Sequence, residues 1–228
     1  MPADDPIICS IHVGIPTHYG TEGAADEMNR AWVTSFAKRP VAGQCWLGRE
    51  NLTGNQQADT KNHGGPDKAA LCYGASHYSN WRTELDHPDF PHGGFGENFT
   101  IAGLSEQTVC IGDTCAVGEA RVQVAQPRGP CWKISRRWRI ADLTERVLKT
   151  GRTGWYLRVL TEGNVEAGMP VILLDRPYPV WTIARVNAII HNRNHPDTAA
   201  LAACPLLAAG LRGRLARRAM TETAEVRI

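Results

Sequence analysis

The 228-residue chain lacks the features that mark several large classes of protein. No apolar run is long enough to cross a bilayer, and the first residues, MPADDPIICS, carry acids where a signal peptide carries bases. We therefore expect a cytoplasmic protein without a membrane partner. The formal net charge is only +2, so the composition does not indicate nucleic-acid binding.

The cysteines also lack a recognisable framework. There are seven, an odd number scattered along the chain, which argues against a set of disulfides and fits a reducing compartment. Cys110 and Cys115 flank a short turn, but no second pair completes a zinc-ribbon pattern. No G-x-G-x-x-G follows a strand and no cysteine run is clustered, so the sequence does not indicate a flavin, haem or iron–sulfur centre.

Short strands and frequent turns dominate residues 7–177. In TVCIGDTCAVGEARVQVAQ, apolar and polar residues alternate between Gly-containing turns, and long helices do not alternate with the strands. This pattern favours a barrel or sandwich. Two helices are predicted within it, over 76–85 with Ser76 as N-cap and over 142–151 with a capping box from Asp142 to Glu145 and a stop at Gly151.

The composition changes after residue 177, where Gly becomes sparse and Ala, Leu and Arg dominate. Short helices are predicted over 182–191, 198–204 and 206–220. Pro177 and Pro179 mark the linker, so we divide the chain into a domain over 1–177 and a three-helix extension over 178–228. The extension is too small to fold well alone and is expected to dock on the first domain or on a second subunit.

The stretch QPRGPCWK places a thiol, Cys131, between Arg128 and Lys133 directly after a predicted strand. Neighbouring cations favour the thiolate form, so the pattern indicates a functional cysteine in a loop. Three alternatives compete with this interpretation. Cys131 could be a buried core cysteine, the start of a C-x5-R phosphate loop ending at Arg137, or the nucleophile of a Cys–His hydrolase with His63 as its base.

Three further segments combine glycines with polar side chains. NHGGPDKA offers His63 and Asp67 around two glycines, GGFGENFT offers Glu97 and Asn98, and TGRTGWYLRV offers Arg152 and Thr153 as an anion site. Taken alone, NHGGPDKA is better explained as a tight turn, GGFGENFT is consistent with a turn into a strand, and TGRTGWYLRV is consistent with a helix C-cap followed by a strand.

The order of the motifs along the chain resembles the MOSC domain family, and within it the bacterial YiiM group associated with resistance to hydroxylaminopurine. The motifs that carry the resemblance are, in chain order, K-x-HGGPDKA, FGEN, IGD, QPRGPC-x-K and TGRTGWY. One departure is Asn55, where the family pattern leads us to expect Asp. The resemblance implies a mainly β fold with some helices (α+β), namely a MOSC-type β-barrel domain followed by a small C-terminal three-helix domain.

The same resemblance implies a molybdenum cofactor (Mo-molybdopterin) with Cys131 as the protein ligand of the metal, and a two-electron reduction of N-hydroxylated compounds. The thiolate suits a metal that already carries the two dithiolene sulfurs of its pterin. Glu97, Asp67 and His63 are the candidate proton donors. The expected cofactor-binding residues are Lys61, His63, Gly64, Gly65, Asn98, Gln126, Arg128, Lys133, Arg152 and Thr153.

Two partners are expected with this function. Electrons should come from a separate reductase, because no electron-transfer motif is visible in the chain, and the apolar helical tail favours a homodimer. A noncatalytic cofactor or sulfur carrier that uses Cys131 is the alternative function, because the same thiolate would serve it.

Overall fold

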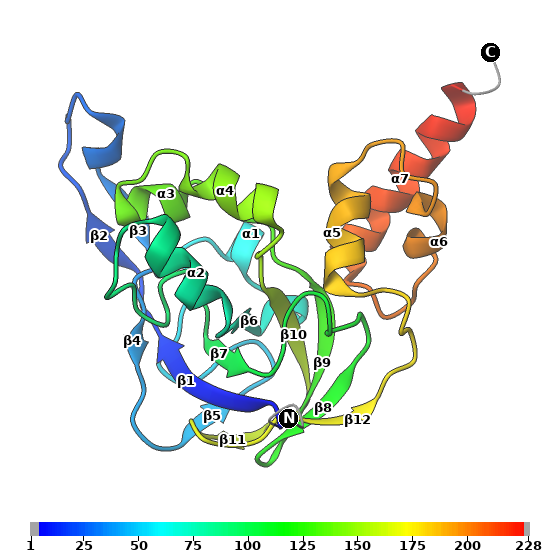
Figure 1. Ribbon diagram of the computed structural model, residues 1–228, viewed down its shortest axis with the longest axis horizontal. Coiled ribbons are helices and arrows are strands. Elements are labelled where there is room, and N and C mark those ends of the chain that lie inside the picture. Colours follow the sequence, from blue (N-terminus) through cyan, green and yellow to red (C-terminus); the bar gives the residue numbers. More distant parts are fainter. Residues whose placement is uncertain (1–4, 226–228) are drawn as a thin grey trace.

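The structure, a computed structural model, describes residues 5–225, with side chains through residue 221. Its centre is an eight-stranded sheet in the order β12-β8-β9-β10-β6-β7-β1-β4, in which only β6 and β7 run parallel (Figure 1). The strands are β1 (Ile7–Val13), β4 (Arg39–Pro40), β6 (Ala70–Gly74), β7 (Phe99–Ala102), β8 (Thr114–Val117), β9 (Ala120–Pro127), β10 (Trp155–Thr161) and β12 (Ile172–Asp175).

The sheet is curled, as the predicted barrel-like fold requires. The segment that leads into β12 reaches the start of β1, where Ile8 N donates to Met169 O at 3.0 Å and Val171 N donates to Pro6 O at 2.7 Å. Two short two-stranded sheets complete the β structure. They pair β2 (Thr17–Tyr19) with β3 (Trp32–Thr34) and β5 (Cys45–Leu47) with β11 (Gly163–Val165).

The apolar residues of the predicted alternating strand lie in the core. Val122 and Val124 on β9 are buried while Arg121 is exposed, and Gly112 and Gly118 make the flanking turns with φ of +85° and +54°. The rest of β9 is buried as well, because the first tail helix packs against this strand. The strand therefore behaves as a central element rather than as one with a solvated face.

Four helices lie over one end of the sheet (Figure 1). They are α1 (Thr60–His63), α2 (His77–Glu84), α3 (Lys133–Trp138) and α4 (Leu143–Thr150), with short 3-10 turns η1 (Glu27–Asn29) and η2 (Pro66–Lys68) elsewhere. The aromatic residues Tyr73, Tyr78, Trp81, Phe90 and Phe95 form a second core with α3 and α4.

Both predicted helices of the first domain form, and the predicted N-cap and C-cap residues occupy those positions, but neither Ser76 nor Asp142 makes a side-chain cap hydrogen bond. Gly151 does end α4, in the left-handed region at φ +70°. The Asp142 side chain makes no cap bond, because its carboxylate accepts from Arg146 Nε at 2.8 Å instead. Ser76 occupies the N-cap position of α2, also without a side-chain cap bond.

The tail forms the three predicted helices, α5 (Ile183–His191), α6 (Thr198–Ala202) and α7 (Ala209–Glu225), the last beginning three residues later than expected. The tail docks on its own barrel. Ala208 N donates to Ala125 O on β9 at 2.9 Å, and leucines and isoleucines of the tail share the main core.

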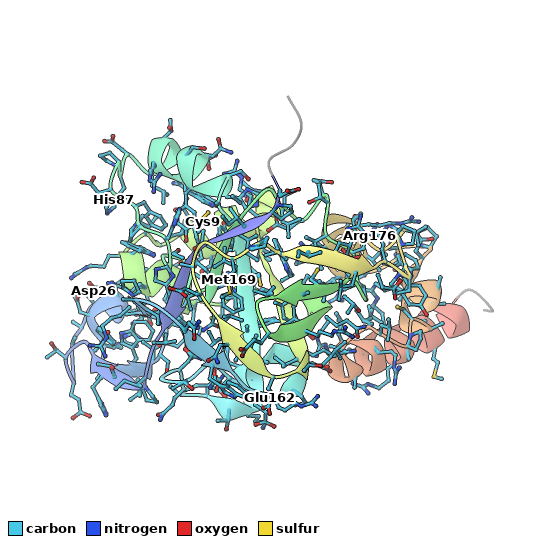
Figure 2. The ribbon with its side chains drawn as sticks, turned by 90° about the horizontal axis from the view of Figure 1, so that it is seen from below. Cys9, Asp26, His87, Glu162, Met169 and Arg176 are labelled. Atoms are coloured by element: carbon cyan, nitrogen blue, oxygen red, sulfur yellow. The ribbon has the colours of Figure 1, made fainter. Side chains whose placement is uncertain are left out.

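The linker to the tail is held by an ion pair. Arg176, labelled in Figure 2 where β12 leads to the helices, donates to both carboxylate oxygens of Asp113 at 2.8 and 2.7 Å.

Among the helices that the structure describes, none combines the length and apolar character that crossing a membrane requires.

Candidate functional site

A cleft opens between the barrel and the tail, and we call it the Cys131 cleft. It has an inner arm that enters the barrel domain and an outer arm that follows α5 and α7. Seven residues line both arms: Asp59, His63, Lys68, Arg128, Cys131, Lys133 and Tyr156. The HGGPDK and QPRGPCWK motifs therefore meet in one place although they are far apart in the sequence.

Cys131 lies in the loop between β9 and α3 and is half-buried. Its carbonyl accepts from Thr144 Oγ1 and from Ile134 N, both at 3.1 Å, so the loop is anchored to α3 and to the start of α4. A thiol on a cleft wall does not fit the core-cysteine alternative. The phosphate-loop alternative is also wrong, because Arg137 is exposed and packs over Trp138, 5.0 Å from the ring centre.

Arg128 presents an unsatisfied donor to this cleft. The side chain is only 4% exposed, and Nη2 donates to Phe95 O at 3.1 Å, while the buried Nη1 has no hydrogen-bond partner. A buried guanidinium nitrogen without an acceptor is costly, so its presence at a cleft wall indicates a site for an anion.

Other cations surround Arg128. Lys38 lines the inner arm, Lys68 and Lys133 line both arms, and Arg214 of α7 lines the outer arm. Among the lining residues the only carboxylate is that of Asp59, which caps α1 by accepting from Asn62 N at 3.1 Å. The charge distribution favours an anionic ligand.

Burial and repulsion between neighbouring positive charges lower the pKa values of Lys38, Lys68 and His63, which favours their neutral forms. Burial, more than the neighbouring Arg128, lowers the pKa of Lys38 to about 7. Burial and then the charge of Arg214 lower the pKa of Lys68. Burial and then Lys133 lower the pKa of His63, so the imidazole is neutral at pH 7.

His63 is placed to act in the cleft. It ends α1, and its Nδ1 lies 3.4 Å from Asp59 Oδ2 but makes no hydrogen bond. A neutral imidazole with a free ring nitrogen is suited to accept or relay a proton. It is the one predicted proton donor that the structure brings to the cleft.

Glu97 is not available for that role. Its side chain is fully buried outside the cleft lining, and its carboxylate accepts from Tyr78 Oη, from Thr100 Oγ1 at 2.8 Å, from Gly93 N at 2.7 Å and from Phe95 N at 3.1 Å. Four donors occupy this carboxylate, so Glu97 holds the FGEN loop in shape.

Asp67 is likewise outside the cleft lining. Its Oδ1 accepts from Arg158 Nε at 2.9 Å, and its Oδ2 accepts from Ala209 N at the start of α7 at 3.0 Å. Asp67 thus joins the barrel to the tail.

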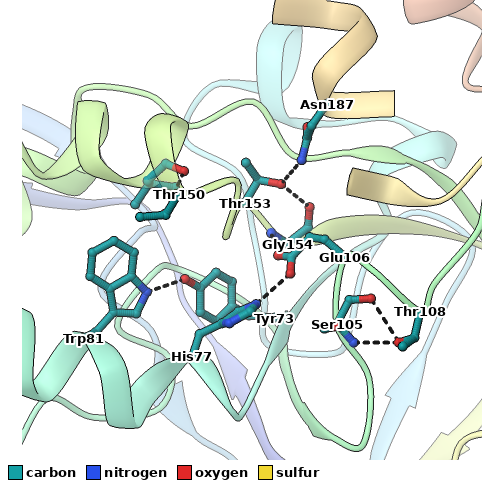
Figure 3. A network of polar contacts seen from close by, with 11 residues as sticks. Tyr73, His77, Trp81, Ser105, Glu106, Thr108, Thr150, Thr153, Gly154 and Asn187 are labelled. Carbon is teal, nitrogen blue, oxygen red and sulfur yellow. Dashed lines mark hydrogen bonds and ion pairs between the residues drawn. The ribbon is translucent and has the colours of Figure 1, made fainter. Parts of the chain in front are cut away.

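The predicted anion site at Arg152 and Thr153 does not face the cleft. Arg152 donates to Glu84 Oε1 at 2.8 Å and packs over Trp81. Thr153 is fully buried and accepts from Asn187 Nδ2 of α5 at 2.8 Å, as Figure 3 shows. Both residues are explained by their structural contacts.

The same network includes a polar contact between Glu106 and His77 (Figure 3). Glu106 Oε1 accepts from Gly154 N at 2.7 Å, and Oε2 contacts His77 Nε2 at 2.6 Å. Through Arg152, Thr153 and Gly154, the TGRTGWY motif therefore connects α2, β10 and α5.

The remaining predicted residues divide between the cleft and its surroundings. Asn98 lines the inner arm, but its amide links strands by accepting from Leu71 N at 3.1 Å and donating to His12 O at 3.0 Å. Gln126 lines the outer arm. Three predicted residues lie outside the lining: Lys61, which is exposed, and Gly64 and Gly65, the latter turning the chain at φ +93°.

Asn55, the position where the motif departs from its pattern, lines the inner arm and is 6% exposed. Its Oδ1 accepts from Gly14 N at 3.1 Å, and its Nδ2 donates to Asn51 Oδ1. The amide therefore bridges two loops, and its nitrogen does what a carboxylate could not do without a proton.

Several lining residues had no signal in the sequence. Lys38, Asp59, Tyr156 and Arg214 reach the cleft from four separate segments, and none was among the predicted site residues, although Tyr156 ends the TGRTGWY motif. Tyr156 on β10 is the one whose position was inferable, since it follows the TGRTGW segment that pairs with β9. Its pKa is raised, chiefly by burial.

Comparison with known protein families matches both the barrel domain and the helical tail. The MOSC domain matches residues 59–172, and the YiiM-like 3-alpha helix domain matches residues 181–221. YflK of Bacillus subtilis (strain 168) is 43% identical over 74% of this chain and 73% of its own length. A protein of Gibberella moniliformis named "Reductase" is 36% identical over 71% of this chain but only 29% of its own length.

A solved structure extends the likeness to the whole molecule. The crystal structure of YiiM from Geobacillus stearothermophilus superposes with a TM-score of 0.77 at 34% identity, covering 93% of this chain and 98% of that one. Barrel and three-helix tail thus occur together in that protein.

Proposed function

The chain belongs to the MOSC domain family, and from that premise we propose that it is a molybdenum-cofactor-dependent reductase of N-hydroxylated compounds. The observation that carries the proposal is the half-buried Cys131 thiol in the same cleft as the unpartnered Nη1 of Arg128. The fungal relative named a reductase supports the same class of activity.

The donor set of the cleft fits the cofactor. Molybdopterin carries an anionic phosphate and a soft metal centre, and the cleft supplies several cations and a thiol. Among residues 5–221, no group of three or more His, Cys, Asp or Glu side chains is arranged for a metal ion. Cys131 would therefore be a single protein ligand to a metal whose other ligands come from the cofactor.

Specific residues would hold the cofactor. Cys131 would bind the metal, the unpartnered Nη1 of Arg128 would donate to an anionic group of the cofactor, and Lys133 would add a second positive charge. Lys68 and Arg214 are the candidate contacts for the phosphate in the outer arm.

The chemistry is a balanced two-electron reduction. When bound, the cofactor supplies a centre that passes two electrons to the N–O bond. In the overall reaction, R–NH–OH, two electrons and two protons give R–NH2 and water, so the nitrogen is reduced and the hydroxyl oxygen leaves as water. His63, neutral and with a free ring nitrogen, is placed to bind or pass a proton in the cleft.

The electrons are proposed to come from a separate reductase protein. The sequence carries no flavin or iron–sulfur motif, and the exposed outer arm leaves one side of the cleft open to a partner. We also propose that two copies of this chain form a homodimer.

An anaerobic assay tests the activity. Protein purified from a host that makes the cofactor would be mixed with hydroxylaminopurine or benzamidoxime and reduced methyl viologen, and the amine or amidine product measured. We expect product with the wild type and with Cys9→Ala, which changes an exposed cysteine outside the cleft, and none with Cys131→Ala.

The same assay separates the alternatives. Molybdenum-loaded wild type that forms no product would defeat the proposed activity. Metal-free protein carrying cyanide-labile sulfur on Cys131 would instead favour the carrier function. Turnover of an ester or amide without molybdenum would favour the hydrolase.

A further inference from the structure

Lys38 lies between two hollows of the molecule. It sits in the short connection between β3 and β4 and lines the inner arm of the Cys131 cleft. It also lines a second, open hollow on the barrel surface, with His12, Pro40, Arg82, Pro91 and His92. We call this second hollow the His12 opening. Lys38 is the residue that the two hollows share.

The amine of Lys38 has no fixed partner. Within residues 5–221, no carboxylate lies in ion-pair contact with Nζ, and no described acceptor takes a hydrogen bond from it. Glu97 acts on Lys38 through its charge, but the four donors around the Glu97 carboxylate already occupy it. The amine is therefore not held in place by a structural ion pair.

Two imidazoles, those of His12 and His92, line the His12 opening together with Lys38. The side chain of His12 is 5% exposed, and its Nδ1 is buried without a partner. Gly93, at φ +80°, packs so closely on the His12 ring that a Cβ there would meet it at 2.9 Å. His92 is half-buried, and its Nδ1 lies 3.3 Å from Ser10 Oγ.

We propose that Lys38 delivers protons into the Cys131 cleft, and that His12 and His92 resupply Lys38 from the His12 opening. The inference rests on the proposed function, because the reduction consumes two protons for each N–O bond broken. A buried imidazole nitrogen without a partner and an unpaired amine, both lining the same opening, are the groups such a route needs.

The proton balance is simple. Lys38–NH3+ gives one proton to the departing hydroxyl, which leaves as water, and the neutral amine then takes a proton from the His12 opening. The second proton of the reaction goes to the nitrogen. The two electrons come from the external reductase, or from reduced viologen in the assay.

The electrostatics around Lys38 support this role. Its pKa is lowered to about 7, chiefly by burial, so the amine exchanges its proton near neutral pH. The charged and titratable groups that face it are Glu97, which opposes the shift, Arg128, which adds to it, and His12, His92 and Arg82 around the opening. Burial lowers the pKa of His12 and of His92 as well.

The first test needs no activity. Full-length protein labelled with 13C at the lysine side chains would be titrated by NMR, with the Lys38 signal assigned by its loss in Lys38→Met. We expect a midpoint near 7 for Lys38, while Lys149, whose pKa is raised by its Glu145 partner, titrates above 10.5. A Lys38 midpoint of about 9 or higher would overturn the inference.

The second test uses the loaded enzyme. General acid catalysis typically contributes 10²- to 10⁴-fold, so Lys38→Met should lower kcat by about 100-fold at pH 7 with little change in KM. In the wild type, kcat should fall as pH rises through about 7, because the donor loses its proton. That fall should vanish in Lys38→Met, and ethylamine should restore part of the rate of Lys38→Ala.

Two further variants complete the design. His12→Phe should slow turnover by about tenfold, with partial restoration by imidazole, because it removes one carrier and not the donor. Lys149→Met, an exposed lysine on α4, should match the wild type. Three results would contradict proton delivery: Lys38→Met with more than half the wild-type kcat, Lys38→Met whose kcat still falls as pH rises through about 7, or Lys38→Ala whose rate ethylamine does not raise.

The two proposals fail in different ways. Loaded wild type without reductase activity would defeat the proposed function, while the NMR midpoint would still judge Lys38. An active wild type with an equally active Lys38→Met variant would defeat the proton route alone.

Discussion

Single residues carry the strongest signal of a ligand in this molecule. Arg128 keeps a guanidinium nitrogen buried and unpaired next to the loop of Cys131, and Lys38 keeps an amine unpaired in the inner arm. Neither charge has a full set of partners: the buried Nη1 of Arg128 lacks an acceptor, and burial lowers the pKa of Lys38 although the charge of Glu97 opposes that shift. Such groups are expected where an anion or a proton is handled.

Replacing Arg128 should separate ligand binding from stability. In Arg128→Met the unpaired buried charge is gone, so the free energy of unfolding of the cofactor-free protein should stay within about 1 kcal/mol of wild type or rise. Cofactor retention should fall by at least about tenfold. Urea unfolding and pterin content after purification measure the two effects.

Arg137→Met is the matched control for this variant, because Arg137 is exposed and packs on Trp138 outside the cleft. It should leave cofactor retention unchanged. Folded Arg128→Met that retains as much cofactor as the wild type would contradict the anion-binding role.

The lowered pKa of Lys38 has a consequence for stability. The unfolded chain keeps the lysine protonated up to about 10.5, while the folded protein releases that proton near 7, so the unfolded state binds more protons between these values. The Lys38 contribution to stability therefore rises with pH across this window.

Lys38→Met removes this pH dependence. Below pH 7 the variant should be more stable than the wild type by about 4 kcal/mol, and the difference should shrink toward zero by pH 10. Urea unfolding at a series of pH values checks this, with Lys149→Met as a control that shows no such trend. A constant difference at all pH values would contradict the assignment.

At the scale of elements, the polar residues of the motifs are divided between binding and scaffolding. Glu97, Asp67, Arg152 and Thr153 were predicted for the site, yet each has structural partners outside the cleft lining. These contacts shape the FGEN loop, the start of α7 and the junction of α4 with β10. Some motif residues therefore stabilise the loops around the cleft and do not line it.

Glu97→Gln tests this scaffolding role. An amide oxygen and an NH2 group cannot replace a carboxylate that accepts four hydrogen bonds, so at least one buried donor loses its acceptor. We expect the free energy of unfolding to fall by about 2–4 kcal/mol. Glu145→Gln, on the exposed face of α4, should cost less than about 0.5 kcal/mol.

Element prediction from the sequence succeeded where periodicity was strong. Alternation in ARVQVAQ identified β9, and the Ala-, Leu- and Arg-rich composition after residue 177 indicated the helical tail. The caps were less predictable, because the Asp142 carboxylate had an alternative partner one turn later in Arg146. The site was predictable only where its residues share a motif, as Arg128, Cys131 and Lys133 do. Lys38 and Arg214 reach the cleft through tertiary packing, which local sequence does not report.

At the scale of the whole molecule, the tail completes the cleft. Asn187, His191 and Arg214 line the outer arm opposite the barrel loops, and α5 is fixed to the barrel through Asn187 and Thr153. The similarity to the Geobacillus structure spans barrel and tail alike. The cleft is therefore a property of the full chain.

Arg214→Ala tests the contribution of the tail. Because Arg214 helps to lower the pKa of Lys68, the Lys68 midpoint in the NMR titration should rise in this variant. The Kd for inorganic phosphate should increase by about three- to tenfold. Arg217→Ala, an exposed arginine one turn later on α7, serves as the control. If Arg214→Ala changes neither the Lys68 midpoint nor the Kd for inorganic phosphate, Arg214 is not part of the site.

Molybdenum content tests the central claim most directly. Wild type, Cys131→Ser and Cys9→Ser would be purified in parallel from a cofactor-producing host and analysed for metal and pterin. We expect stoichiometric molybdenum in wild type and in Cys9→Ser and its loss in Cys131→Ser. Wild type that carries no molybdenum, or Cys131→Ser that retains as much as wild type, would contradict Cys131 as the metal ligand.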